Sequence, residues 1–197
     1  MIAWKAFAPK NKKGRAEGRY SAPSLSIFLI PIFLILTYSC ATPGNVSGSR
    51  YTRLIENVPF YPQETHQCGP ASLAGALNYW GVKVIPEDIA EEIYSKAAKG
   101  TLNLDMVIYP QKKGLIAIQY RGSTEDLRKN IDSDNPIIVM VDYGYHLYQV
   151  NHFMVVVGYN ELGVIVNSGK KKGEFLGEKD FLKAWEKTNF WTLLIKR

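Results

Sequence analysis

The spacing of apolar residues changes along the chain from a helical period to the pattern of buried strands. Leu73, Leu77 and Trp80 recur at helical spacing, with small residues between them, and predict a helix that begins near Cys68. Pro70 suits the first turn of this helix, where its missing N–H costs nothing. Further helices are predicted at residues 86–99, 101–114, 123–131 and 178–187.

The second half of the chain carries the pattern of strands. The apolar runs at 136–143 and 152–160 are rich in β-branched residues and indicate buried strands. A turn near residues 160–163 joins the second run to residues 163–169 as a hairpin. Other strands are predicted at 58–63, 115–121 and 190–197. Helices followed by an antiparallel sheet indicate the α+β fold class.

Charge is distributed unevenly along the chain. Residues 1–39 contain six Lys or Arg and one Glu, whereas the remaining residues contain 18 basic and 17 acidic side chains. The part that folds is therefore nearly neutral and lacks the electrostatic footprint of a nucleic-acid-binding domain. The lysine run at 170–172 lies between two glycines and is interpreted as a solvated loop.

The apolar run at residues 25–38 is interpreted as an export signal. Its 14 residues fall short of the roughly 20 that cross a membrane but match the roughly 7–15 of a signal-peptide core. Cys40 follows Ser39 at the end of this stretch, which resembles the cleavage site of a bacterial lipoprotein. We predict a signal peptide at residues 1–40 with lipidation of Cys40; an ordinary cleaved signal and an uncleaved anchor are the alternatives.

The residues after Cys40 are small and polar, as a flexible tether should be. We assign residues 41–56 to this tether and residues 57–197 to one domain. These assignments predict an exported, membrane-anchored lipoprotein of a bacterial envelope, with its domain facing the periplasm or the exterior.

Cys68 is the first candidate for chemistry. The chain has two cysteines, and lipidation of Cys40 would leave Cys68 without a partner, although exported proteins tend to pair their cysteines. At a helix N-terminus the backbone N–H groups and the helix dipole should lower the pKa of the thiol. A nucleophile is the functional interpretation, and a buried structural cysteine is the alternative.

A thiol nucleophile needs a base, and the base needs an orienting group. Of the three histidines, His152 is preferred over His146 and His66 because it begins the strongest strand, where a side chain is rigidly placed. Simple hairpin pairing places Asn167 opposite residue 156, roughly 13 Å along the strand from His152. The orienting group is therefore left open among Asn167, Ser168, Asp142 and Asn160.

An oxyanion hole needs hydrogen-bond donors that face the developing negative charge. The backbone N–H of Cys68 is one candidate. Among side chains, Gln63 can turn back towards the thiol, whereas Gln67 adjoins Cys68 and its side chain should diverge from it.

Four stretches, "VPFYPQ", "QCGPASLAGALNYWG", "NHFMVVVGYN" and "GVIVNSG", resemble the papain-like peptidases that remove double-glycine leaders from bacteriocins, the thirty-ninth family of cysteine peptidases. The resemblance covers roughly residues 57–197 and is closest to the free-standing, exported branch of that family. It implies a papain-like fold, with Cys68 as nucleophile, His152 as general base, Gln63 as oxyanion donor and Asn167 as the third catalytic residue.

The leading hypothesis is a membrane-tethered cysteine peptidase that cleaves an exported peptide or protein through a Cys-His-Asn triad. A papain-like amidase or acyltransferase could use the same triad on a non-protein amide, and a catalytically silent peptide-binding module is the third possibility. We expect no metal, because the cysteines and histidines lack zinc spacing. We also expect no cofactor and no use of ATP, since no nucleotide-binding segment is recognisable.

Overall fold

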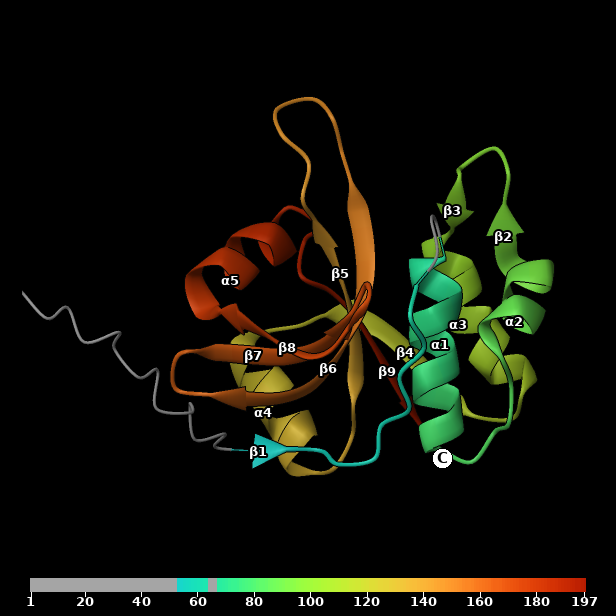
Figure 1. The fold of residues 1–197 in the computed structure, drawn as a ribbon, viewed down its shortest axis with the longest axis horizontal. Helices are drawn as coiled ribbons and strands as arrows, with labels where there is room; N and C mark the ends of the chain where they lie inside the picture. The colour runs from blue at the N-terminus through green and yellow to red at the C-terminus, as the bar shows by residue number, and fades with distance from the viewer. Residues whose placement is uncertain (1–52, 64–66) are drawn as a thin grey trace, which may run out of the picture. The chain divides into compact units, whose positions relative to one another are not determined.

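The structure, a computed structural model, describes residues 53–63 and 67–197 (Figure 1). The predicted signal peptide, Cys40 and most of the predicted tether lie outside these residues. Within them the chain forms an α+β fold, as the order of helices and strands predicts. No helix in the described part of the chain is long and apolar enough to cross a membrane.

Five helices are present in the described residues. They are α1 (Cys68–Tyr79), α2 (Pro86–Ile93), α3 (Asn103–Lys112), α4 (Thr124–Asp132) and α5 (Glu178–Glu186). α1, α2 and α3 lie together on one side of the sheet, and α4 and α5 lie on the other (Figure 1). The predicted cap of α4 is confirmed, because the Ser123 hydroxyl accepts a hydrogen bond from the backbone N–H of Asp126 at 3.1 Å.

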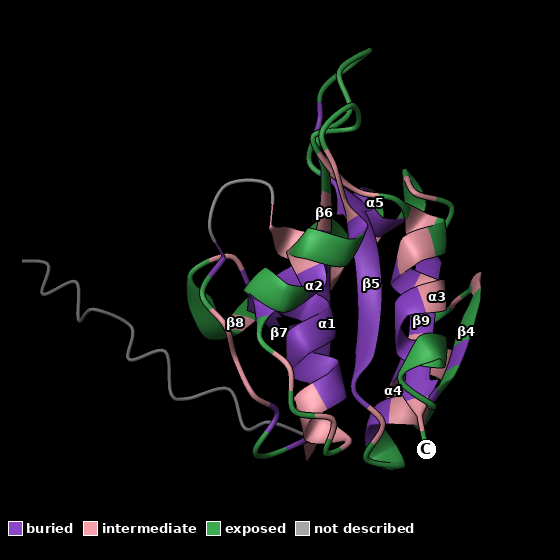
Figure 2. Ribbon diagram, turned by 90° about the vertical axis from the view of Figure 1, so that its right-hand side faces the viewer, coloured by how far each residue is buried: buried purple, intermediate pink, exposed green. Residues whose placement is uncertain are grey.

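Seven strands form the main sheet, and every pairing in it is antiparallel. The order is β4-β9-β5-β6-β7-β8, and β1 pairs with β6. β5 is buried along its whole length (Figure 2), which explains its continuous apolar sequence. The strands are β1 (Arg53–Leu54), β4 (Ile116–Arg121), β5 (Ile137–Asp142), β6 (Asn151–Asn160), β7 (Gly163–Ser168), β8 (Lys171–Gly177) and β9 (Trp191–Lys196).

Helix α1 is the central helix of the fold. Nine consecutive residues, 69–77, are buried, so this helix is apolar on all sides, as a helix inside a core must be. Gly75 allows the helix to approach the chain before it, because a Cβ there would lie 2.8 Å from the Pro59 carbonyl oxygen. On the same side, the Val155 side chain of β6 lies in ordinary contact distance. α1 therefore packs against the middle of β6.

Four predicted boundaries differ from the structure. The helix predicted at 86–99 ends at Ile93, because residues 94–101 form a separate hairpin of β2 (Tyr94–Ser95) and β3 (Gly100–Thr101). Residues 58–63 form no strand. The loop predicted at 170–172 lies mostly in strand β8. This edge strand is exposed, so its sequence begins with lysines and shows no apolar alternation that would predict a strand. Residues 53–56, assigned to the tether, include β1 and the buried Ile55.

A bulge interrupts the pairing of β6 with β7. Asn160 pairs with Gly163 and Gly158 with Ile165, but Val156 pairs with Val166, so one extra residue, Val157, sits in β6. The Val157 carbonyl accepts a hydrogen bond from the backbone N–H of Ile55 at 2.7 Å. The bulge shifts the pairing of β7 by one residue along the part of β6 that precedes Val157, which includes His152.

The loop between β5 and β6 is held at its base by a buried carboxylate. One oxygen of Asp142 accepts hydrogen bonds from the backbone N–H groups of Gly144, at 2.7 Å, and Val150, at 2.8 Å. These bonds, chiefly the one from Val150, hold the pKa of Asp142 below its ordinary value despite the opposing effect of burial. Asp142 thus fixes both ends of the loop at residues 143–150.

We expect Asp142→Ala to lower the free energy of unfolding by about 1–3 kcal/mol, because the backbone N–H groups of Gly144 and Val150 lose their acceptor. The folded pKa is depressed, so the contribution of the carboxylate is complete above the unfolded pKa, ordinarily 3.8, and is lost as pH falls through the folded value. Urea unfolding of Asp142→Ala and wild type at neutral and acid pH measures this. Equal stability at neutral pH, or a deficit that persists unchanged in acid, would contradict it; Glu161→Ala, at an exposed carboxylate, is the control.

Candidate active site

Cys68 is the first residue of α1 and is partly exposed. Its helix begins there because Gln67 provides the first carbonyl of the helix, which accepts from the Ala71 N–H at 3.0 Å. Backbone N–H groups of Phe153, Gly69 and Cys68 itself lie close enough to the thiol to lower its pKa. Phe153 directly follows His152, so the thiol lies against the segment of β6 that carries His152.

The pKa of the Cys68 thiol is nevertheless raised above its ordinary value. Burial of the sulfur is the largest influence, and it outweighs the three backbone N–H groups. The expectation that the helix N-terminus alone would lower this pKa is therefore wrong for this structure. Cys68 is a protonated thiol at neutral pH.

His152 is the second residue of β6, and its ring is half-buried. Ring atom Nε2 lies 2.9 Å from the hydroxyl oxygen of Ser168, the last residue of β7. Burial lowers the pKa of His152 below 6.5, and the Glu174 carboxylate opposes this effect. The imidazole is therefore neutral at neutral pH, and no hydrogen bond within the described residues joins it to Cys68.

Ser168, rather than Asn167, is the side chain that meets the His152 ring. Residues directly opposite each other in an antiparallel pair share a face, and successive residues alternate. The Val157 bulge pairs Asn167 with Val155, which is three residues along β6 from His152, so Asn167 lies on the opposite face from His152. The Asn167 side-chain oxygen instead accepts from the Gly173 N–H at 3.0 Å.

The other candidates for the orienting group have different partners. Asp142 holds the base of the β5–β6 loop. Asn160 accepts a hydrogen bond from the Leu162 N–H and so closes the β6–β7 turn. Of the other histidines, His146 is exposed in the β5–β6 loop, where its ring packs on that of Tyr145, and His66 lies outside the described residues.

Gln63 is buried next to the same end of the sheet. Its backbone N–H donates to the carbonyl of Gly169, at 2.9 Å, and Gly169 directly follows Ser168. Gln67 takes a different position, on the wall of an open pocket of about 490 Å³ with Glu87 and Glu91 of α2. The backbone of Gln63 is thus held beside Ser168, the residue that contacts His152.

Two residues near His152, Glu174 and Tyr143, were not predicted as site residues. Glu174 of β8 acts on His152 electrostatically, but it lies in a strand that the apolar pattern does not reveal. Tyr143 lies with its ring centroid 6.0 Å from that of His152, and its place at the end of the strand predicted at 136–143 gives no sign of this contact. No cluster of three potential metal ligands occurs in residues 53–63 and 67–197.

Residues 55–192 match the model of the peptidase C39-like family. The chain belongs to this family. An uncharacterized protein of Methanothermobacter thermautotrophicus is 30% identical over 113 residues, which make up 57% of this chain and 72% of that protein.

Solved structures show the same fold. A putative C39-like peptidase from Bacillus anthracis superposes with a TM-score of 0.64 at 18% identity, covering 74% of this chain and 97% of that one. The peptidase domain of Streptococcus ComA gives 0.59 at 24% identity, with coverage of 71% and 98%. A double glycine motif protease from an AMS/PCAT transporter, solved with its leader peptide, gives 0.59 at 26% identity, with coverage of 74% and 96%. The fold is therefore that of C39 papain-like peptidases.

Proposed function

We propose that this chain is a membrane-tethered cysteine peptidase that cleaves an exported peptide or protein. Family membership and the fold support the reaction class. The observation that carries the proposal is the convergence of two contacts at one end of β6: the Phe153 N–H faces the Cys68 thiol, and Ser168 holds the neighbouring His152 ring.

Cys68 is the nucleophile in this proposal and His152 is its general base. If Nε2–H donates to the Ser168 oxygen, the lone pair of Nδ1 is free to take the thiol proton. The sulfur then attacks the scissile carbonyl carbon, and the imidazolium passes the proton to the leaving amine nitrogen. Water, deprotonated by the same ring, hydrolyses the resulting thioester and releases the sulfur.

The oxyanion of the tetrahedral intermediate needs donors near the start of α1. The Cys68 backbone N–H and the Gln63 side-chain amide are the candidates, and Gln63 is fixed beside Ser168 through its own backbone. Loss of one such donor typically lowers turnover by about 10²–10³, which is the effect that we expect for Gln63→Ala.

In this proposal the reaction starts from a neutral thiol and a neutral imidazole. Burial raises the pKa of Cys68 and lowers that of His152, so both groups disfavour the ion pair. Ser168 is uncharged and orients the ring without stabilising the imidazolium. We infer that the proton moves when substrate binds, because a bound carbonyl gives the thiolate its target.

The substrate class that we propose is leader peptides, because one relative, the double glycine motif protease, was solved in complex with its leader peptide. A non-protein amide is the competing substrate, since the same residues would attack it. A silent peptide-binding module is the other alternative, favoured by the missing hydrogen bond between thiol and imidazole. The variants below separate these possibilities.

We expect Cys68→Ala and His152→Ala each to abolish turnover of a fluorogenic peptide that contains a Gly-Gly-X bond, because the pair acts as one unit. Ser168→Ala should lower turnover by about 10-fold or more through loss of ring orientation, while Asn167→Ala, the matched control, should leave it within a factor of a few. Activity should fall in acid as His152 becomes protonated below pH 6.5. Circular dichroism verifies that each variant is folded.

Four results would count against this proposal. Full turnover by a folded Cys68→Ala would remove the peptidase assignment, and full turnover by a folded His152→Ala would remove the mechanism. If Asn167→Ala loses activity and Ser168→Ala does not, Asn167 takes the orienting role. A wild-type chain that cleaves cell-wall amides but no peptide would support the amidase.

Cys40 is the proposed membrane anchor, on the strength of its place after the apolar run at 25–38. We expect Cys40→Ala to incorporate no labelled fatty acid in a bacterial host, and either to leave the membrane fraction or to remain as an uncleaved precursor. Cys68→Ala is the matched control, because it removes the other cysteine. Wild-type labelling, size and fractionation of Cys40→Ala would show that the anchor lies elsewhere.

A further inference from the structure

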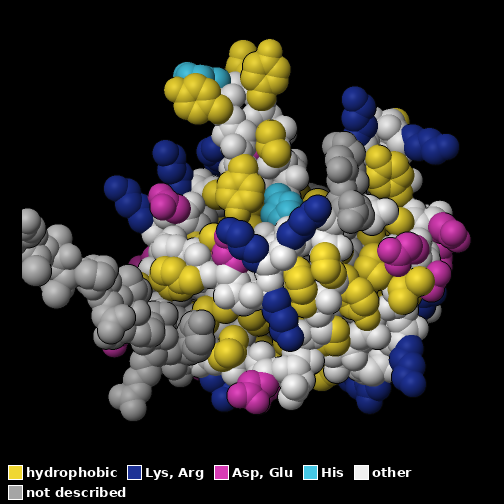
Figure 3. Space-filling model, in the orientation of Figure 1, with side chains coloured by type: hydrophobic (Ala, Val, Ile, Leu, Met, Phe, Trp, Pro, Cys, Tyr) yellow, Lys and Arg dark blue, Asp and Glu magenta, His cyan; other side chains and the backbone are white. Residues whose placement is uncertain are grey.

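The loop between β5 and β6, residues 143–150, extends beyond the rest of the domain and carries apolar side chains into solvent (Figures 1 and 3). We name it the aromatic hairpin. At its tip Leu147 is 95% exposed, Tyr148 is 82% exposed and Tyr145 is 77% exposed. Three large apolar side chains this exposed in one place mark an interaction surface.

The aromatic hairpin is a formed structure. Tyr145 and Tyr148 make an isolated antiparallel bridge, with the Tyr148 N–H donating to the Tyr145 carbonyl at 3.1 Å. At its base Asp142 accepts two backbone N–H groups, and Lys187 of the segment after α5 donates to the Gly144 carbonyl at 2.7 Å. These contacts hold the tip side chains outward.

The segments at the tip carry lysines and no acids. Residues 143–151 contain no Asp or Glu, and neither do residues 95–101, which include the β2–β3 turn. That turn projects in the same direction as the aromatic hairpin (Figure 1) and carries the exposed Lys96 and Lys99. At the base of the hairpin the charge of Lys187 is offset by the Asp142 carboxylate, and Glu174 acts on Tyr143, so the positive charge lies at the β2–β3 turn.

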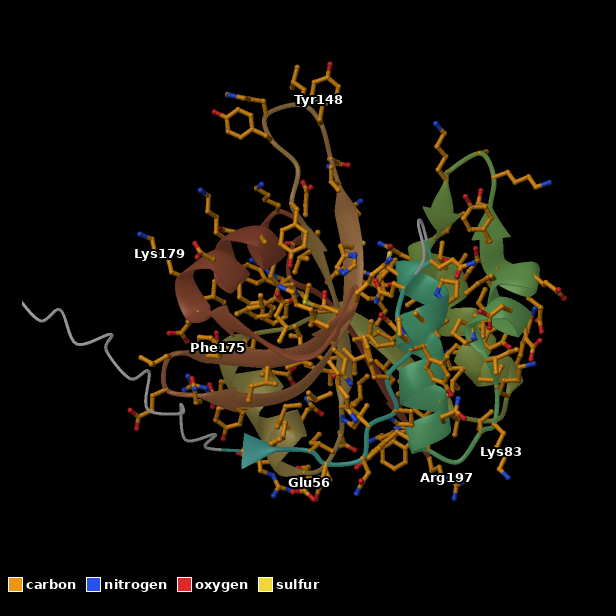
Figure 4. The ribbon with its side chains drawn as sticks, viewed as in Figure 1. Glu56, Lys83, Tyr148, Phe175, Lys179 and Arg197 are labelled. Carbon is orange, nitrogen blue, oxygen red and sulfur yellow. The ribbon has the colours of Figure 1, made fainter. Side chains whose placement is uncertain are left out.

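We propose that this end of the domain docks on anionic lipid, with the aromatic hairpin in the interface and Lys96 and Lys99 against the headgroups. Tyrosine is favoured at membrane–water interfaces, leucine gains free energy on entering the acyl boundary, and lysines near the surface are attracted by anionic headgroups. The tip is convex, and Tyr148 points away from the domain (Figure 4). A convex tip suits insertion into a bilayer, whereas a peptide would be bound in a groove.

The geometry of the chain allows this docking together with an anchor at residue 40. The chain enters the domain at β1, which pairs with Tyr159 and Gly158, at the opposite end of β6 from the hairpin. The eight residue steps of strand from Asn151 to Tyr159 span roughly 26 Å. The 12 residues at 41–52 can reach at most about 40 Å, which is more than that span.

The docking is testable on residues 46–197, without the apolar run. All buried apolar residues of the described core lie between Ile55 and Ile195, and the Bacillus anthracis relative matches this chain over 97% of its own length. This fragment is therefore expected to fold by itself. The probes are vesicles of phosphatidylcholine alone and of phosphatidylcholine mixed with phosphatidylglycerol, and binding is measured by co-sedimentation.

We expect the fragment to bind the mixed vesicles more tightly than the neutral ones, with an affinity that falls as salt is added. Leu147→Ser should weaken binding by about tenfold, the value of one leucine leaving an apolar environment. Lys96→Gln with Lys99→Gln should reduce the preference for anionic lipid. Leu162→Ser is the matched control, because Leu162 is an exposed leucine in the β6–β7 turn, away from this surface.

Several outcomes would overturn the proposal. They are no binding of the wild-type fragment to mixed vesicles, equal binding by Leu147→Ser and wild type, and an equal loss in Leu162→Ser. A higher KM for peptide in Leu147→Ser with unchanged vesicle binding would assign the hairpin to the substrate instead. Vesicle binding by Cys68→Ala should equal that of wild type, so this result is independent of the proposed peptidase activity.

Discussion

The register of β6 against β7 determines the chemistry of the candidate site. If the pairing of Asn160 with Gly163 continued without interruption, Asn167 would lie opposite Val156, four residues from His152 and on its face of the sheet. The single extra residue, Val157, changes that face for every later residue of β7. An uncharged hydroxyl, that of Ser168, therefore meets the imidazole where an amide would otherwise have been placed.

Burial favours the neutral form of both partners of the proposed reaction. It raises the pKa of the Cys68 thiol and lowers that of the His152 imidazole, because each group is stabilised in its neutral form away from water. A carboxylate on the ring would counteract this effect, but Ser168 contributes no charge, and Glu174 opposes it only in part. Burial thus favours the neutral form of both groups.

Much of the fold could be predicted from the sequence, because its core elements carry strong local patterns. The apolar helix that begins at Cys68 and the buried strands β5 and β6 were recognisable from period and composition alone. The edge strand β8 was not, because exposed strands need no apolar alternation and this one begins with lysines. The β2–β3 hairpin was not predicted, because residues 94–99 were assigned to the helix that contains α2.

The identities of Cys68 and His152 as candidates also followed from the sequence, but the partner of His152 did not. The bulge depends on a tertiary contact, because the Val157 carbonyl accepts a hydrogen bond from the N–H of Ile55, which directly follows β1 and lies about 100 residues earlier in the chain. Local propensity contains no sign of it. Pairing by simple counting therefore could not separate Asn167 from Ser168. The pKa of Cys68 was equally inaccessible, since it depends on how deeply the sulfur is buried.

The most direct test of the central claim is the pKa of the His152 ring, followed by NMR titration in the wild-type chain, in Ser168→Asp and in Asn167→Asp. A carboxylate in contact with the ring stabilises the imidazolium and raises its pKa. The account predicts a wild-type value below 6.5, a clear rise in Ser168→Asp and little change in Asn167→Asp. A rise in Asn167→Asp with none in Ser168→Asp would contradict it, because Asn167 would then share the face of His152.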